Sequence, residues 1–121
     1  MGWMSDGPRT LRIYSTVGGR KPFQEWIDSL KDYRAQARIL VRLDRIRMGN
    51  FGDVKPVAEG ICELRIDAGP GYRVYFGQDG DSLVILLWGG SKATQQADIA
   101  NAKRYWKDYR SREHATKRTL R

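Results

Sequence analysis

Residues 54–99 read VKPVAEGICELRIDAGPGYRVYFGQDGDSLVILLWGGSKATQQADI, and this stretch decides the fold. Within it, residues 61–67 and 72–76 alternate apolar and polar side chains, which predicts two strands that each bury one face. Residues 82–88 are apolar almost throughout, as expected of a strand that is covered on both sides. Glycine-rich and aspartate-rich turns separate these segments, so the stretch predicts an antiparallel meander.

The residues before this stretch predict one strand and two helices. Residues 10–16 alternate apolar and polar side chains, which is typical of a strand. Apolar residues recur at helical spacing over residues 22–30, with Pro22 suited to the first helical position. A second helix is expected from Asp32, as its cap, to about residue 48, because Gly49-Asn50 follows.

The ends of the meander complete the predicted fold. Pro56 lacks a backbone donor, so residues 54–58 are expected to form a short strand at a sheet edge. We expect Gly89-Gly90 to end the last strand and Thr94 to cap a final helix. A strand, two helices, a three- to four-stranded meander and a C-terminal helix predict an α+β fold, with helices on one face of a small antiparallel sheet.

Size and composition indicate one cytoplasmic domain. A chain of 121 residues fits a single domain over residues 1–121, with residues 1–8 and 110–121 expected to be flexible. No apolar run approaches the ~20 residues that span a membrane, and we expect no secretory signal. Cys62 is the single cysteine, which fits a reducing compartment. One cysteine and one histidine, His114, do not make a zinc site of the usual kind, and we expect neither metal nor cofactor.

Positive charge is concentrated in two places. The net charge is +8, and residues 103–121 hold eight Lys or Arg against two acidic residues. Such a segment attracts nucleic acid, an acidic protein or an anionic surface, and a solvated terminus is an equally good interpretation. The second helix is expected to carry a stripe opposite its apolar face, which is either solvated or in contact with nucleic acid phosphates. The stripe consists of Arg34, Arg38, Arg42 and Arg45.

A third group of charges falls on the predicted polar face of the sheet. Alternation places Glu63, Arg65, Arg73 and Tyr75 on this face, which we expect to be uncovered, and Lys55 and Lys92 flank it. Two arginines beside a carboxylate, with lysines at the ends of neighbouring elements, indicate a pocket for a ligand that carries phosphate.

The motifs in this region resemble a known family. ELRIDAGPGYRVYF, followed by an apolar strand and GGSKATQQADIANA, resembles the RelE/ParE superfamily of type II toxins. The resemblance is greatest to the addiction-module killer proteins, which are similar to HigB and to phage Gp49-like proteins. ARILVRLDRIRMGNFGDVKPVAEG matches the helix, turn and lysine-bearing strand of that branch, so the resemblance covers about residues 10–103.

The resemblance implies a small cytoplasmic toxin that a co-expressed antitoxin neutralises. The antitoxin is expected to be a helix-turn-helix protein similar to HigA, through which the complex contacts DNA only indirectly. RelE-like members act at the ribosome and cleave mRNA without a metal, whereas ParE-like members inhibit DNA gyrase. A non-catalytic module that binds nucleic acid or an antitoxin is a third possibility, because a shared fold does not fix a function. The cations on the sheet favour the mRNA endonuclease.

The resemblance also implies roles for individual cations. Arg65 occupies the position of a catalytic lysine or arginine on the first meander strand, and Arg73 matches the arginine that binds the scissile phosphate. Lys92 stands where the family has a basic residue near the leaving group. Lys55, before the meander, is expected to contact a further phosphate.

Three other positions complete the expected site. Glu63 stands where RelE has a lysine, and it is either a general base or the ion-pair partner of an arginine. Gln95, at the start of the last helix, is expected to contact RNA bases. Asp98 falls near the position of the C-terminal tyrosine of RelE, which has no clear counterpart in this sequence.

Overall fold

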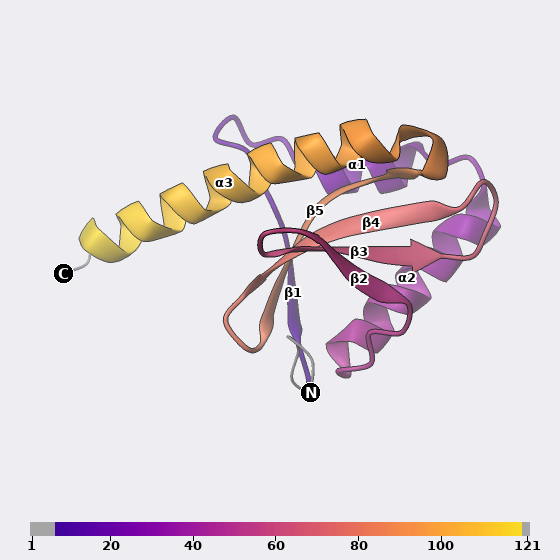
Figure 1. The fold of residues 1–121 in the computed structure, drawn as a ribbon, viewed down its shortest axis with the longest axis horizontal. Coiled ribbons are helices and arrows are strands. Elements are labelled where there is room, and N and C mark those ends of the chain that lie inside the picture. Colours follow the sequence, from indigo (N-terminus) through magenta and orange to yellow (C-terminus); the bar gives the residue numbers. More distant parts are fainter. Residues whose placement is uncertain (1–6, 120–121) are drawn as a thin grey trace.

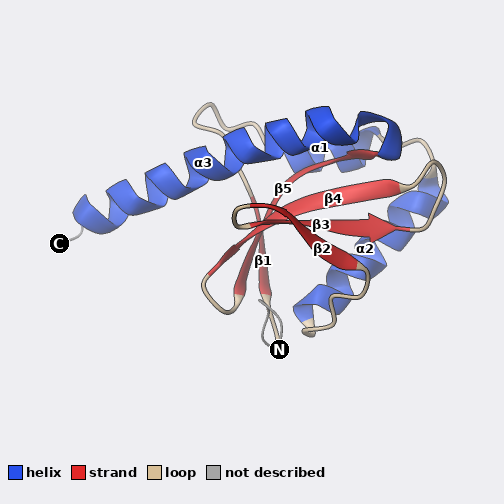
Figure 2. Cartoon of the chain, in the orientation of Figure 1, coloured by secondary structure: helices blue, strands red, loops and turns tan. Residues whose placement is uncertain are grey.

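A five-stranded sheet with helices on both faces forms the domain (Figure 1, Figure 2). The computed structural model describes the backbone of residues 7–119 and the side chains of residues 7–113. Its elements are β1 (Thr10–Ile13), α1 (Pro22–Ser29), α2 (Tyr33–Arg47), β2 (Val54–Ala58), β3 (Ile61–Ile66), β4 (Tyr72–Asp79), β5 (Leu83–Ser91), a 3₁₀ turn η1 (Lys92–Thr94) and α3 (Gln95–Thr119). The α+β prediction is therefore confirmed.

The order of the strands is β1-β5-β4-β3-β2. Strands β2 to β5 form an antiparallel meander with β2 at the edge, as the sequence predicts. Strand β1 lies parallel to β5, with Thr10 opposite Leu83 and Ile13 opposite Leu86. The predicted antiparallel sheet is thus confirmed for β2 to β5 and does not extend to β1, because alternation identifies a strand without specifying the direction of its partner.

Both faces of the sheet are covered, and the prediction of helices on one face is wrong. Helices α1 and α2 pack on one face and α3 crosses the other (Figure 1). In β5, Val84 and Leu86 belong to the core under α1 and α2, whereas Ile85 and Leu87 belong to the core under α3. A strand that is apolar at consecutive positions needs cover on both sides, which is the reason for the second helical layer.

Gly89 and Gly90 do not end β5, which runs on to Ser91. A Cβ atom at Gly89 would overlap the indole of Trp26 in α1, and one at Gly90 would overlap the carboxylate of Asp98 in α3. The pair therefore lets helices on opposite faces approach the same strand closely, a role that glycine has in strands as well as in turns.

The helix ends agree with the sequence in part. The side chain of Asp32 accepts a hydrogen bond from the Ala35 amide and caps α2, and Gly49, at φ +89°, follows its end. Helix α3 begins directly after Thr94 but continues to Thr119, so residues 110–119, expected to be flexible, are helical. Residues 1–6 and 120–121, which share that expectation, lie outside the described residues.

Contacts with the loop after β1 hold the middle of α3 in place. Tyr14 donates a hydrogen bond to Asp108, and Arg112 forms an ion pair with Asp108 at 2.7 Å and donates to the carbonyl of Ser15. Burial, followed by the hydrogen bond to Asp108, raises the pKa of Tyr14 to about 12. Among residues 7–119, no helix is long and apolar enough to cross a membrane.

Candidate functional site

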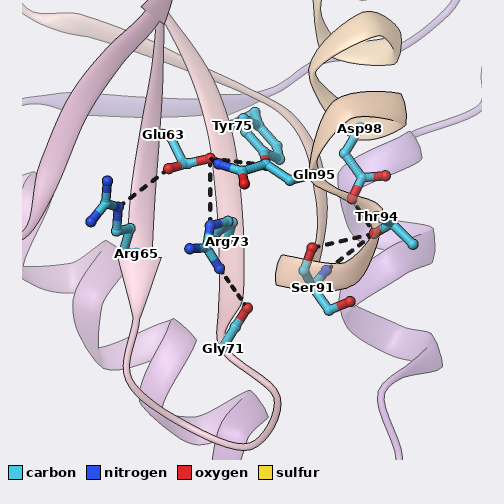
Figure 3. A network of polar contacts seen from close by, with 9 residues as sticks. All are labelled: Glu63, Arg65, Gly71, Arg73, Tyr75, Ser91, Thr94, Gln95 and Asp98. Atoms are coloured by element: carbon cyan, nitrogen blue, oxygen red, sulfur yellow. Dashed lines mark hydrogen bonds and ion pairs between the residues drawn. The ribbon is translucent and has the colours of Figure 1, made fainter.

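The register of the sheet places the predicted site residues in two neighbouring rows. In the first row Lys55, Glu63 and Tyr75 lie directly opposite one another on β2, β3 and β4. In the second row Arg65 on β3 lies opposite Arg73 on β4. Since residues two apart on a strand share a face, both rows lie on the side of the sheet that α3 crosses (Figure 3).

Glu63 lies at the centre of this cluster, and its side chain is completely buried. Its Oε2 accepts hydrogen bonds from the Tyr75 hydroxyl at 3.1 Å and from the Gln95 amide at 2.8 Å. Its Oε1 accepts from Nε of Arg65 at 3.3 Å, and Nε of Arg73 lies 3.5 Å from Oε2. Buried charges are tolerated when they are paired and hydrogen-bonded, and Glu63 meets both conditions.

These contacts favour the ion-pair role of Glu63 over the role of general base. A base must lie within reach of the proton it removes, and the Glu63 side chain is completely buried and hydrogen-bonded at both oxygens. Burial, followed by the charge of Glu63, raises the pKa of Tyr75, so its hydroxyl keeps the proton that it donates. The expectation that Glu63 and Tyr75 lie on an uncovered face is wrong, because α3 covers both side chains.

A single backbone oxygen joins Arg73 to Lys92. The carbonyl of Gly71 accepts from Nη1 of Arg73 at 3.0 Å and from the backbone amide of Lys92 at 2.9 Å. Gly71 adopts φ +83°, which disfavours any other residue, and a Cβ there would lie 3.4 Å from Nη1 of Arg73. The turn between β3 and β4 thus fixes the start of η1 beside the arginine.

The cations differ in accessibility. The Arg65 side chain is 39% exposed, whereas that of Arg73 is 12% exposed. Lys55 and Lys92 are exposed. The Nε of Arg73 is buried and close to Glu63 without a well-formed hydrogen bond, and its Nη1 donates to Gly71. Within the described part of the chain, Nη2 of Arg73 has no hydrogen-bond partner, which leaves this nitrogen for a ligand.

Comparison with known proteins identifies the family. The family described as "Phage derived protein Gp49-like (DUF891)" matches residues 25–107. The chain belongs to this family. It is a RelE-like family of the toxin type, which suggests a protein related to phages or addiction modules and an antitoxin as partner. An uncharacterized protein of Haemophilus influenzae (strain ATCC 51907 / DSM 11121 / KW20 / Rd) is 50% identical over 94 residues, which are 78% of this chain and 91% of the relative.

Two residues at the start of α3 position this Gp49-like site. The amide of Gln95 is bound to Glu63, which joins the first residue of α3 to β3. Asp98 is buried and accepts from the indole of Trp88 at 2.7 Å and from the hydroxyl of Thr94. Asp98, expected near the position of the RelE tyrosine, therefore holds η1 and α3 against β5 (Figure 3).

The arginine stripe of α2 lies on the other face of the sheet from the Gp49-like site. Arg42 donates to the carbonyls of Arg65 at 2.6 Å and Phe51 at 3.1 Å, and burial lowers its pKa. Arg38 donates to the carbonyl of Asp67. The sequence predicts a stripe that is either solvated or in contact with phosphates, whereas two of its members, Arg38 and Arg42, instead join α2 to the end of β3. Arg34 and Arg45 are exposed.

Sequence reasoning missed the carbonyl of Gly71 and the hydrogen bond from Tyr75 to Glu63. The second could have been found, because a hairpin between residues 66 and 72 sets Tyr75 directly opposite Glu63. The first depends on the backbone path after β5, for which the sequence carries no signal. Among residues 7–113, no group of three or more His, Cys, Asp or Glu side chains lies close enough to hold a metal ion.

Proposed function

We propose that this Gp49-like chain is a HigB-like toxin of a type II toxin–antitoxin system that cleaves mRNA on the ribosome. The observation that carries the proposal is the pairing of Arg65 and Arg73 with the buried carboxylate of Glu63 (Figure 3). The backbone of Lys92 is held beside Arg73 by the carbonyl of Gly71. Lys55 is opposite Glu63 in the next strand. Together these cations offer a positive surface that suits an RNA backbone.

The cations suit the chemistry of RNA cleavage without a metal. In this reaction the 2′-oxygen attacks the adjacent phosphorus and the 5′-oxygen leaves, which produces a cyclic phosphate and a 5′-hydroxyl. Nη2 of Arg73 is available to bind a non-bridging oxygen, where negative charge grows in the transition state. The ammonium of Lys92 is exposed and able to donate a proton to the 5′-oxygen. Solvent takes the 2′-proton, because Glu63 is already bonded.

Alanine substitution of Arg73 tests the assignment. Losing one charge-assisted contact in a transition state lowers a rate by on the order of 10² or more, so Arg73→Ala should lower cleavage of mRNA in a translation extract by that factor. Arg20→Ala is the matched control, because Arg20 is exposed and pairs only with Glu25 within the described residues. Circular dichroism should show that both variants are folded. Full cleavage by Arg73→Ala would place the reaction elsewhere.

Pulse labelling in growing bacteria separates this activity from gyrase inhibition. Induced expression should stop incorporation of labelled amino acid before that of labelled thymidine, because translation is the proposed target. Arg73→Ala should restore both. If DNA synthesis stops first while translation continues, the chain acts as a ParE-like gyrase inhibitor. If the wild-type chain stops neither, it is a binding module of the same fold.

A further inference from the structure

The outer surface of α2 exposes apolar side chains that the fold does not use. Among the described residues, five large apolar side chains are exposed, and four of them lie on α2 or at its C-cap. Tyr33 is 77% exposed and Met48 is 70% exposed, while Leu40 and Val41 are each 48% exposed. Single exposed apolar residues need no explanation, whereas a group on one helix indicates an interaction surface.

These residues form one stripe along the helix. At ~100° per residue, Tyr33, Leu40, Val41 and Met48 fall within a sector of about 100°. The core-facing residues Ala35, Ile39, Leu43 and Ile46 occupy a second sector. The arginine stripe lies between the two sectors, so the prediction that it lies opposite the core-facing residues is wrong. Asp44 also falls in the exposed sector, where it forms an ion pair with Arg47 on the same helix. Helix α2 therefore has an apolar face toward the sheet and a second, largely apolar face toward solvent, which is more than a surface helix needs.

A groove runs between the exposed stripe and the end of β3. It has a volume of about 590 Å³, and its lining includes Ala37, Val41 and Ile66. Arg34 and Arg45 also line it. Within the described residues neither of these two arginines makes a side-chain hydrogen bond or an ion pair. By contrast, Arg38 and Arg42 are bound to backbone carbonyls.

We propose that α2 is the docking surface for an acidic amphipathic helix of a protein partner. The apolar side chains of such a helix would cover the stripe of Tyr33, Leu40, Val41 and Met48. Its carboxylates would pair with Arg34 and Arg45, a combination typical of helix-in-groove recognition. This proposal does not rest on nuclease activity, because the surface lies on the opposite face of the sheet from Arg73.

Charge complementarity selects this occupant over two others. A second copy of the chain carries a net charge of +8, so its approach to a groove lined by arginines is opposed by like-charge repulsion. RNA would use the arginines but leave Leu40, Val41 and Met48 without apolar partners. An acidic amphipathic helix uses both features of the surface.

Nuclear magnetic resonance and fluorescence anisotropy with a designed peptide test the proposal. The probe is a labelled 18-residue helical peptide with leucine at positions i, i+3, i+4 and i+7 and glutamate on both flanks. Added to the ¹⁵N-labelled full chain, it should shift amide signals of α2. A peptide of the same pattern with lysine in place of glutamate should bind at least about tenfold more weakly, because it meets the arginines with like charge.

Substitutions in the chain locate the contact. Val41→Glu should weaken binding of the acidic peptide by about tenfold or more, and Arg34→Glu combined with Arg45→Glu should do the same and reduce the dependence on salt. Val17→Glu is the matched control, because Val17 is 81% exposed and lies outside α2. It should bind the peptide as the unchanged protein does.

Four results with the peptides would overturn the proposal, and a fifth result, with RNA, would replace it. The four are no binding at millimolar peptide, shifts at Arg65 and Arg73 in place of α2, equal weakening by Val17→Glu, and equal binding of the lysine peptide. If single-stranded RNA of similar length shifts the same α2 signals and displaces the peptide, the surface is a nucleic-acid site instead.

Discussion

On the α2 side of the sheet Arg42 donates to the carbonyls of Arg65 and Phe51, whereas on the α3 side Arg65 and Arg73 share the carboxylate of Glu63. The guanidinium of Arg42 donates its hydrogen bonds to backbone carbonyls, so Arg42 stabilises the fold and has few donors left for a ligand. Glu63 holds its two arginines by their Nε atoms, which leaves guanidinium nitrogens toward a ligand. A count of arginines in the sequence does not separate these uses, because the difference lies in the acceptor that each arginine meets.

The largest effect should come from removing the shared acceptor. Glu63→Ala leaves the largely buried Arg73 and the partly exposed Arg65 opposite each other without a counter-charge, and breaking a buried pair costs about 3–5 kcal/mol of unfolding free energy. Urea denaturation measures the loss. Glu25→Ala, which removes a surface partner of Arg20, should leave the urea midpoint nearly unchanged. Equal midpoints for the two variants would mean that Glu63 does not hold the site.

Arg42→Ala should separate stability from activity. Hydrogen bonds from a charged group to carbonyls are worth about 1.5–3 kcal/mol, so this variant should unfold at lower urea concentration. At temperatures where it is fully folded, its cleavage of mRNA should match that of the unchanged protein. Arg73→Ala should show the opposite combination, with the larger loss in cleavage. A loss of cleavage by Arg42→Ala that exceeds its unfolded fraction would give Arg42 a role in the site.

The glycine pair allows the two faces to be disturbed one at a time. Gly90→Ala forces a methyl group against Asp98 and Gly89→Ala forces one against Trp26, and overpacking of this kind costs about 1–3 kcal/mol. Both should lower the melting temperature. Only Gly90→Ala should also lower cleavage by folded protein, because Asp98 holds the segment that carries Lys92. Gly18→Ala is the control, since a Cβ there meets only the Thr16 hydroxyl at 3.9 Å.

The smallest effect concerns pH and the contact between α3 and the loop after β1. The pKa of Tyr14 is raised from 10.0 to about 12, so its neutral form is favoured in the folded protein. This contribution to stability is complete below pH 10 and is lost as pH rises toward 12. Tyr14→Phe should therefore flatten the decline of urea midpoint between these values. An unchanged slope would show that Tyr14 titrates normally, and absorbance titration at alkaline pH measures its pKa directly.

Alternation in β3 and β4 was sufficient to predict which residues share a face, and the proximity of Arg65 and Arg73 follows from it. Alternation does not report what covers a face, so the burial of Glu63 by α3 was not predicted. The apolar run in β5 contained that information, because Ile85 and Leu87 need cover of their own. The prediction that Gly89-Gly90 ends β5 is wrong for a physical reason: glycine is favoured both in turns and where a helix packs closely against a strand.

Arg73 and Lys92 are held side by side because both donate a hydrogen bond to the main-chain oxygen of Gly71. Because every residue carries this oxygen, no point substitution deletes it, and side chains around the turn can diverge among relatives without changing the spacing of the two cations. Only a substitution that changes the backbone conformation at residue 71, where φ is +83°, would alter the spacing of Arg73 and Lys92. The carboxylate shared by Arg65 and Arg73 is less protected in evolution, because one codon change at Glu63 removes it.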